Sequence, residues 1–154
     1  MKILLAPTRG GEASYPNQDL AIRLAKENGA RLFFLYVSDV RFLGSLSVSY
    51  LEDLERNLAD MGEFLLTMAQ ERAEKAGYSA EIVVRRGNFG AALRNVISDI
   101  GATHVLIGAP TRTGLTDWDY LNDLTGRLVN ELGVGVYIAD AGKIVAERHP
   151  ADTD

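Results

Sequence analysis

The chain has 154 residues, of which 47% are hydrophobic and 24% are charged, and its net charge is −5. These values are typical of one globular domain, and the acidic balance argues against a nucleic-acid partner, because phosphate backbones are bound by basic faces. The lack of cysteine excludes disulfides and thiolate chemistry. No apolar run approaches the roughly 20 residues that cross a bilayer. We therefore expect a cytoplasmic protein without a membrane partner.

Two similar hexads, at residues 6–11 and 109–114, share the order Ala-Pro-Thr-Arg. Each follows a short apolar run, which is typical of a buried strand that leaves a sheet. Proline lacks a ladder donor and holds the preceding residue extended, so Pro7 and Pro110 mark the points where strand pairing stops. If the two strands are neighbours, the hexads face one another. A chance match of four residues is the alternative.

A helix and a second strand are predicted after the first hexad. Asn17 is placed to cap the helix, Gly29 ends it, and residues 31–37 are apolar enough for a buried strand. The following loop, residues 39–48, is more apolar than a solvated loop. We expect it to pack on the next helix.

One long helix and a further β–α–β unit are predicted in the middle of the chain. Ser49 and Glu52 have the spacing of a capping box, and apolar residues step by three and four from there to Gly77. This stripe fits a helix that covers a sheet better than a coiled-coil seam. Residues 80–85 and 103–107 predict strands, and Asn88 caps the helix between them.

The last part of the chain predicts a helix and a strand. Helical steps run from Trp118 to Gly133, with Gly126 either inside the helix or at its start. Residues 134–139 predict a fifth strand, which residues 140–146 can extend into a hairpin. We expect one domain over residues 1–146 and a polar tail over residues 147–154.

Strands that alternate with helices predict a single α/β domain with a five-stranded parallel sheet and helices on both faces. Such sheets commonly have the strand order 3-2-1-4-5 or 2-1-3-4-5, and they bind ligands at the carboxyl ends of the strands where the order reverses. In the order 3-2-1-4-5 the reversal lies between strands one and four. Both hexads would then stand at one crevice.

The sequence resembles the universal stress protein family up to about residue 140. The resemblance rests on Lys-Ile-Leu-Leu-Ala-Pro-Thr at the start, Leu-Ala-Ile-Arg-Leu-Ala-Lys at 20–26, Ala-Arg-Leu-Phe-Phe-Leu-Tyr-Val at 30–37, and Ala-Thr-His-Val-Leu-Ile-Gly at 102–108. It implies a Rossmann-like 3-2-1-4-5 sheet and a homodimer, commonly formed by edge-to-edge pairing of the last strand, here residues 134–139. In this family, the members that bind a nucleotide hold ATP where the strand order reverses, and the resemblance implies the same position for a ligand here, between strands one and four.

The family's nucleotide motif is altered here. ATP-binding members resemble Gly-x2-Gly-x9-Gly-Ser/Thr, a loop that cradles phosphates. Gly108 fills the first position, Thr111 replaces the second glycine, and Gly126 followed by Arg127 is the candidate for the last pair. Arg9 stands where the family often has an aspartate facing ribose and adenine, and a guanidinium cannot accept sugar hydroxyls. These changes argue against ATP in the family's usual pose.

We interpret the changes as an anion pocket rearranged from a nucleotide site, with ATP and AMP as candidate ligands. Guanidinium groups suit phosphate or carboxylate oxygens. The alternative is a degenerate pocket whose arginines are solvated or pair with nearby carboxylates. The candidate ligand-binding residues are Pro7, Thr8, Arg9, Val37, Gly108, Ala109, Thr111, Arg112, Gly114, Gly126 and Arg127.

The sequence shows no nucleophile paired with a base and no metal-ligand spacing. We interpret His104 as a packed histidine in a core strand, and Asp117 and Asp119 as an acidic first turn of a helix. The leading hypothesis is a non-enzymatic, homodimeric stress-response protein that binds a nucleotide or another anionic small molecule. A ligand-free dimeric interaction module and a slow nucleotide hydrolase are the alternatives.

Overall fold

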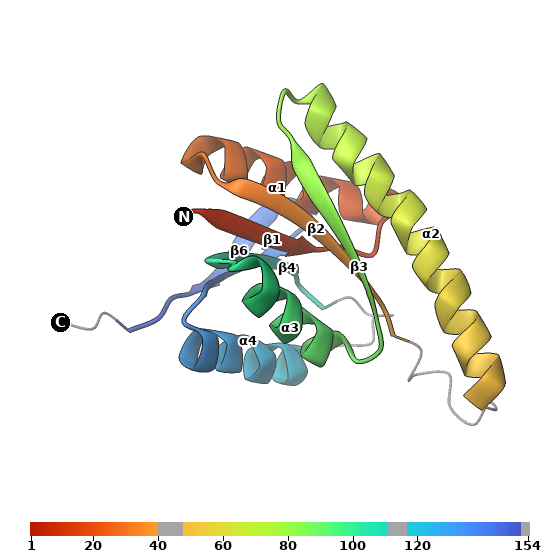
Figure 1. The fold of residues 1–154 in the computed structure, drawn as a ribbon. Helices are drawn as coiled ribbons and strands as arrows, with labels where there is room; N and C mark the ends of the chain where they lie inside the picture. Colours follow the sequence, from red (N-terminus) through yellow and green to blue (C-terminus); the bar gives the residue numbers. More distant parts are fainter. Residues whose placement is uncertain (40–47, 111–116, 152–154) are drawn as a thin grey trace.

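The computed structural model describes residues 1–39, 48–110 and 117–151, with the backbone alone for residues 48–51. Its centre is a six-stranded sheet in the order β3-β2-β1-β4-β5-β6 (Figure 1). All neighbouring strands are parallel except β5 and β6. The strands are β1 (Ile3–Pro7), β2 (Arg31–Ser38), β3 (Ala80–Arg86), β4 (His104–Gly108), β5 (Gly135–Asp140) and β6 (Lys143–Arg148).

Helices cover both faces of the sheet. The elements are α1 (Tyr15–Asn28), α2 (Val48–Lys75), α3 (Phe89–Ile100), α4 (Trp118–Leu132) and a short 3-10 turn, η1 (Glu12–Ser14). In Figure 1, α1 and α2 lie on one side of the sheet and α3 and α4 on the other. Successive residues of β1 serve the two cores: Leu4 packs with Leu66 of α2, and Leu5 packs with Leu93 of α3.

The predicted strand order 3-2-1-4-5 is confirmed, and the predicted hairpin adds β6 as an antiparallel edge strand. The sheet is therefore mixed. β6 reaches Arg148, so residues 147 and 148 belong to the sheet and not to a polar tail. Arg148 is held by hydrogen bonds from its guanidinium to Thr125 and Asn122 of α4. The last two residues of β6, Glu147 and Arg148, are polar, so no apolar pattern distinguishes them from a tail.

The position of β6 also changes the expected dimer. Both sides of β5 are occupied, by β4 on one side and β6 on the other, so the edges of the sheet are β3 and β6. Edge-to-edge pairing of two chains through residues 134–139 does not fit this structure, because the backbone donors and acceptors of β5 are used inside the sheet.

The predicted helix starts have mixed outcomes. Asn88 caps α3 as expected, since its side-chain oxygen accepts from the amide of Ala91 at 2.9 Å. Asn17 does not cap α1, which already begins at Tyr15. The Asn17 side chain instead accepts from the amide of Gly142 at 2.8 Å and donates to the carbonyl of Ala139 at 3.4 Å. It ties α1 to the β5–β6 hairpin.

Two predictions about the entry to α2 lie outside the described residues. These are the packing of the apolar loop, of which residues 40–47 are not described, and the capping role of Ser49, whose side chain is not described. The long helix itself is confirmed as α2. Among the helices that the structure describes, none is long and apolar enough to cross a membrane.

Candidate ligand-binding site

The strand order reverses between β1 and β4, as the order 3-2-1-4-5 requires. β1 pairs in parallel with β4 through Leu4–His104 and Leu5–Val105, so the two hexads leave the same edge of the sheet. The structure describes the first hexad completely and the second as far as Pro110. The candidate residues Thr111, Arg112 and Gly114 lie outside the described part of the chain.

The turn after β1 is fixed by backbone and side-chain contacts. The amide of Thr8 donates to the carbonyl of Leu35 at 2.8 Å, and the amide of Gly10 donates to Thr8 Oγ1 at 3.1 Å. Gly10 has φ +74°, and a Cβ built there would lie 2.6 Å from Cβ of Leu65 on α2. Only glycine combines this backbone conformation with so close an approach. The turn is therefore held against α2.

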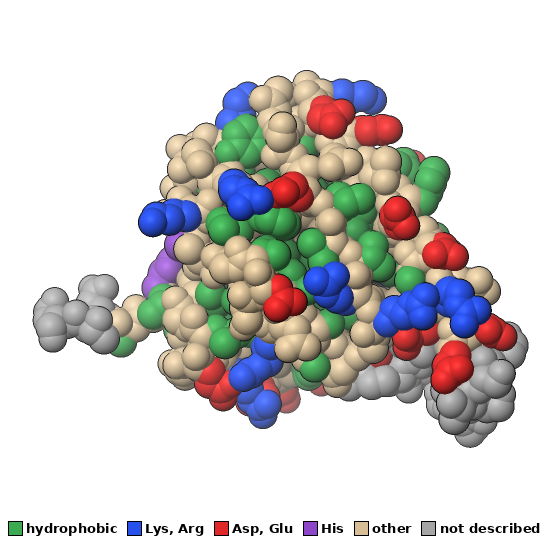
Figure 2. All heavy atoms as spheres, in the orientation of Figure 1, with side chains coloured by type: hydrophobic (Ala, Val, Ile, Leu, Met, Phe, Trp, Pro, Cys, Tyr) green, Lys and Arg blue, Asp and Glu red, His purple; other side chains and the backbone are tan. Residues whose placement is uncertain are grey.

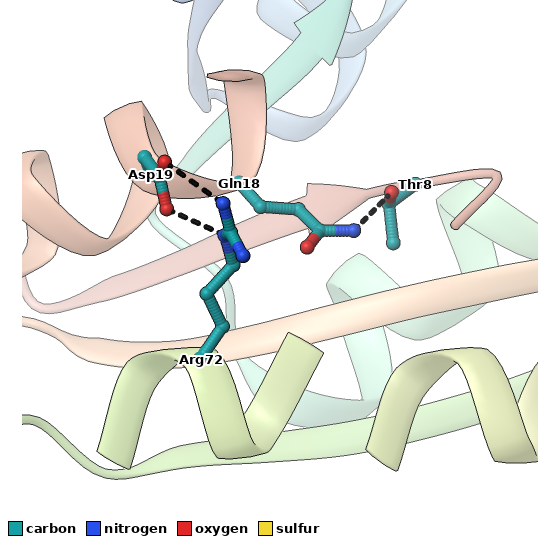
Figure 3. Close-up of polar contacts among 4 residues, drawn as sticks. All are labelled: Thr8, Gln18, Asp19 and Arg72. Atoms are coloured by element: carbon teal, nitrogen blue, oxygen red, sulfur yellow. Dashed lines mark hydrogen bonds and ion pairs between the residues drawn. The ribbon is translucent and has the colours of Figure 1, made fainter. Parts of the chain in front are cut away.

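Gln18 of α1 points toward Thr8 of the turn, as Figure 3 shows. Its side chain is 3% exposed, and Nε2 donates to Thr8 Oγ1 at 3.1 Å. The next residue, Asp19, accepts two hydrogen bonds from the guanidinium of Arg72 on α2. Thr8 Oγ1 thus accepts twice, and no described residue accepts its own proton. The hydroxyl of Thr8 keeps a donor for a ligand.

Arg9 is the exposed cation of this turn. Burial raises the pKa of the Tyr36 phenol, and the nearby charge of Arg9 opposes that shift, so the guanidinium lies within electrostatic range of Tyr36. Among the residues that the structure describes, Arg9 has no ion pair and no hydrogen bond from its side chain. Its donors are available to an anion.

The carboxyl end of β4 consists mostly of backbone and small side chains. Gly108 is exposed, and a Cβ built there would lie 3.5 Å from Nδ2 of Asn17. The amide of Ala109 donates to the carbonyl of Ala139 at 2.7 Å. Pro7 ends β1, and Val37, near the end of β2, packs against the core under α3 and α4. The described candidate residues on strands one, two and four thus share one sheet edge.

Gly126 and Arg127 have a different environment from the one the sequence suggested. Gly126 lies two turns inside α4, so of the two alternatives the glycine inside the helix is confirmed and the glycine at its start is wrong. Arg127 forms an ion pair with Asp123, with a nitrogen–oxygen distance of 3.0 Å. It lines an open groove of about 460 Å³ between α3 and α4, together with residues that include Arg94. Arg127 is therefore not an unpaired cation like Arg9.

The amino terminus of α4 carries a negative charge. Asp117 is the N-cap residue, and its carboxylate accepts from the amide of Tyr120 at 2.8 Å. Asp119 lies in the first turn, so the predicted acidic first turn is confirmed. A phosphate that approached this terminus would meet the Asp117 carboxylate in place of free amide donors. The sequence contains a signal for this helix start, because Asp117 is a favoured N-cap residue and directly precedes Trp118, the first residue of the helix.

In the part of the chain that the structure describes, no three or more His, Asp or Glu side chains lie close enough together to hold a metal ion. His104 is partly exposed at the start of β4 and contacts Thr103 and Tyr137, in agreement with the packed histidine that the sequence predicted. It stacks on Tyr137 at the amino edge of the sheet, with ring centroids 5.9 Å apart.

Comparisons with known proteins agree with this fold. The model of the universal stress protein family matches residues 1–138. A search of curated proteins finds no match. Similar solved structures include the universal stress protein UspA from Lactobacillus plantarum, with 15% identity over 89% of this chain and 96% of that chain and a TM-score of 0.71.

Two further similar structures contain a nucleotide. One is a universal stress protein in complex with cAMP, with 20% identity over 90% of this chain and 96% of that chain and a TM-score of 0.62. The other is a universal stress protein family protein from Arabidopsis thaliana with AMP bound, with 12% identity over 91% of this chain and 92% of that chain and a TM-score of 0.56. At these identities the structures show a shared fold. The family match, which spans most of the chain, shows that this protein belongs to the universal stress protein family.

Proposed function

We propose that the protein binds a nucleotide or another anionic small molecule at the carboxyl edge of the sheet, between β1 and β4, without catalysing a reaction. The observation that carries the proposal is Arg9, an exposed cation in the turn after β1 that has no ion pair and no side-chain hydrogen bond among the described residues. A guanidinium offers several donors in a planar arrangement that suits phosphate and carboxylate oxygens. The bound cAMP and AMP in structures of the same fold support a nucleotide as the ligand class.

The turn that carries Arg9 is suited to binding because it is already ordered. Thr8 is held by Gln18 and by the amide of Gly10, and Gly10 itself packs on Leu65. A ligand would therefore meet a fixed turn with one free hydroxyl donor and one free guanidinium. Binding to a preorganised turn avoids most of the entropy cost of ordering a loop.

The start of α4 favours ligands that carry few phosphate groups. In open α/β sheets, phosphates commonly bind at the amino terminus of the helix that follows a strand at the switch point. Here Asp117 fills that terminus, and Asp119 adds a second negative charge in the first turn. We therefore propose that a nucleoside monophosphate or a cyclic nucleotide binds better than ATP.

A homodimer is part of the same proposal, with β6 in the place that we first expected for residues 134–139. β6 is an edge strand, and its side chains Ile144 and Val145 are 38% and 52% exposed. An apolar edge strand is a template for pairing with a second copy. Sedimentation velocity at micromolar concentration tests this part, and a monomer at all concentrations would contradict it.

A second candidate function is a ligand-free interaction module. The observation that favours it is an exposed apolar stripe on α2, formed by Met61, Phe64 and Met68 with spacings of three and four. Phe64 is 66% exposed, which is unusual for a side chain that has no partner surface. A stripe of this kind suits a helix or a groove of another protein.

Isothermal titration calorimetry with AMP, cAMP, ATP and inorganic phosphate distinguishes the two candidates. We expect AMP or cAMP to bind the native protein, and Arg9→Ala to weaken that binding at least tenfold, because a charge-assisted contact is lost. The matched control is Arg23→Ala, which removes an exposed arginine of α1 that also has no ion pair among the described residues. If none of the four compounds binds the native protein, nucleotide binding is refuted and the interaction module is favoured.

A further inference from the structure

The chain contains two histidines, and both lie at the amino edge of the sheet, opposite the proposed ligand site. His104 begins β4 and is paired in register with Gly135 of β5. On the other side of β5, Val136 pairs with Arg148, which places His149 beside Gly135. His104, Gly135 and His149 therefore form one row across three neighbouring segments. Figure 2 shows histidine, in purple, at the surface beside the C-terminal end of the chain.

Gly135 allows the two imidazoles to approach each other. Residues on alternate strands are roughly 9.5 Å apart, so a side chain between them would normally separate the two rings. A Cβ built on Gly135 would lie 2.9 Å from Nε2 of His104 and 3.1 Å from Nδ1 of His149. These two nitrogens therefore lie close to the same point above the glycine. The ring centroids are 6.4 Å apart.

The ring of Tyr137 contacts the imidazole rings of both His104 and His149. It lies two residues after Gly135, on the same face of β5, and its ring centroid is 5.9 Å from that of His104 and 5.7 Å from that of His149. The three rings therefore lie next to one another, although His149 follows the end of β6.

The outer nitrogens of the two rings have polar neighbours. Nδ1 of His104 lies 3.1 Å from Thr103 Oγ1, which accepts from the amides of Lys2 and Ile3 and donates to the carbonyl of Ile3. Both lone pairs of that oxygen are therefore used, and this contact does not select the tautomer of His104. A metal ion would bind the tautomer in which Nε2 carries no proton. Nε2 of His149 lies 3.3 Å from a carboxylate oxygen of Glu147, which accepts only, so Nδ1 of His149 keeps its lone pair.

We propose that Nε2 of His104 and Nδ1 of His149 bind one divalent transition-metal ion above Gly135, with water in the remaining coordination positions. Imidazole suits Zn²⁺, Cu²⁺ and Ni²⁺, and Cu²⁺ binds most tightly in this series. Glu147 acts behind His149 as the carboxylate that orients a metal-binding imidazole. Bound at this position, the ion links the start of β4 to the end of the β6 segment across β5.

Both rings must turn to meet one ion, because the atom of His104 nearest to the Cβ position of Gly135 is Cδ2, at 2.6 Å, and not Nε2. Metal–nitrogen distances are about 2.0–2.1 Å, so the two nitrogens must come within about 4 Å of each other. His149 is exposed and lies beyond the last residue of β6, so it can turn toward His104 without breaking the ladder. Burial lowers the pKa of His104, which favours the neutral ring that a metal requires.

Copper titration of the untagged protein tests the site. The chain has two histidines and no cysteine, so every imidazole signal comes from His104 or His149. We expect one Cu²⁺ per chain, pulsed electron paramagnetic resonance couplings from two imidazoles, and displacement of Cu²⁺ by an excess of Zn²⁺. His149→Ala should leave one imidazole coupling and lower the affinity at least tenfold. Glu147→Gln should lower it roughly tenfold, as expected for a residue that orients a ligand.

The control variant is Glu27→Gln, which removes an exposed carboxylate of α1 far from the histidines in sequence. It should bind copper as the native protein does. Unchanged copper affinity in His149→Ala, or couplings from a single imidazole in the native protein, would overturn the proposal. Circular dichroism and thermal unfolding of each variant show that the comparison is between folded proteins, which the exposed position of His149 favours.

Discussion

Replacing Asp117 with serine tests how the start of α4 selects its ligand. Serine is as good an N-cap residue as aspartate, so the hydrogen bond to the amide of Tyr120 can be kept while the negative charge is removed. The helix should therefore form as before, with a change in the free energy of unfolding within about 0.5 kcal/mol. The perturbation is electrostatic.

The magnitude can be estimated for a phosphate that lies about 8 Å from the Asp117 carboxylate. Two unit charges about 8 Å apart at an effective dielectric constant of about 20 repel by about 2 kcal/mol, which is a factor of about 30 in binding. Screening at physiological salt, with a Debye length of about 8 Å, leaves about 0.8 kcal/mol, which is a factor of about four. A triphosphate places more charge near α4 than a monophosphate does. Asp117→Ser should thus raise the affinity for ATP about fourfold at physiological salt, and more at low salt, and change the affinity for AMP by less than it changes that for ATP.

Calorimetry with ATP and AMP at low and high salt measures the effect. Asp60→Asn is the matched control, because it removes one negative charge from an exposed position of α2 that has no ion pair among the described residues. The control should leave the ratio of the ATP and AMP affinities unchanged. If Asp117→Ser binds AMP like the native protein but does not gain affinity for ATP, the charge of Asp117 does not select the ligand and this reasoning is refuted.

Three other predictions concern stability. Gly10→Ala should lower the free energy of unfolding by about 2–4 kcal/mol, because it combines a positive φ with a clash against Leu65. The control Gly101→Ala, at φ +69° but with open space around the new Cβ, should lower it by about 1–2 kcal/mol. Equal losses of stability in urea unfolding would show that the clash with Leu65 does not contribute. Arg148→Ala should release β6 from α4, seen as faster hydrogen exchange in β6 with little change in β2. Burial lowers the pKa of His104 in the folded state, so its contribution to stability is present above the unfolded pKa of about 6.5 and is lost as the pH falls below it. Unfolding measured at pH 7.5 and pH 5 should show a smaller loss for His104→Gln than for the native protein, and an equal loss would contradict the assignment.

The positions of the parallel strands could be predicted because the signals that mark them are local. Each parallel strand is a short apolar run that ends in turn residues, and Pro7 and Pro110 mark two of these ends directly. Parallel crossovers restrict the topology further but leave two strand orders open, and the family resemblance implied the order 3-2-1-4-5 that the structure has. The edge strand β6 was only partly predicted, since Glu147 and Arg148 are polar and are held by β5 and α4.

The site was harder to predict because its details depend on contacts between distant parts of the chain. Asn17 has the character of a helix cap, yet its partners Ala139 and Gly142 lie on the hairpin more than 120 residues away. Arg127 was grouped with Arg9 because Gly126 and Arg127 were matched to the last pair of the family's nucleotide motif, whereas both residues lie inside α4. The cluster of His104 and His149 needs the register of β4, β5 and β6, which no short sequence pattern contains.

The most direct test of the central claim is a nuclear magnetic resonance titration of the isotope-labelled protein with AMP. If the ligand binds at the carboxyl edge between β1 and β4, the largest amide shifts should occur at Thr8, Arg9 and Gly10 and at Gly108 and Ala109. Saturating shifts at these positions, lost in the Arg9→Ala variant, are the predicted result. Shifts confined to the groove between α3 and α4, or no shifts at millimolar AMP, would contradict the claim.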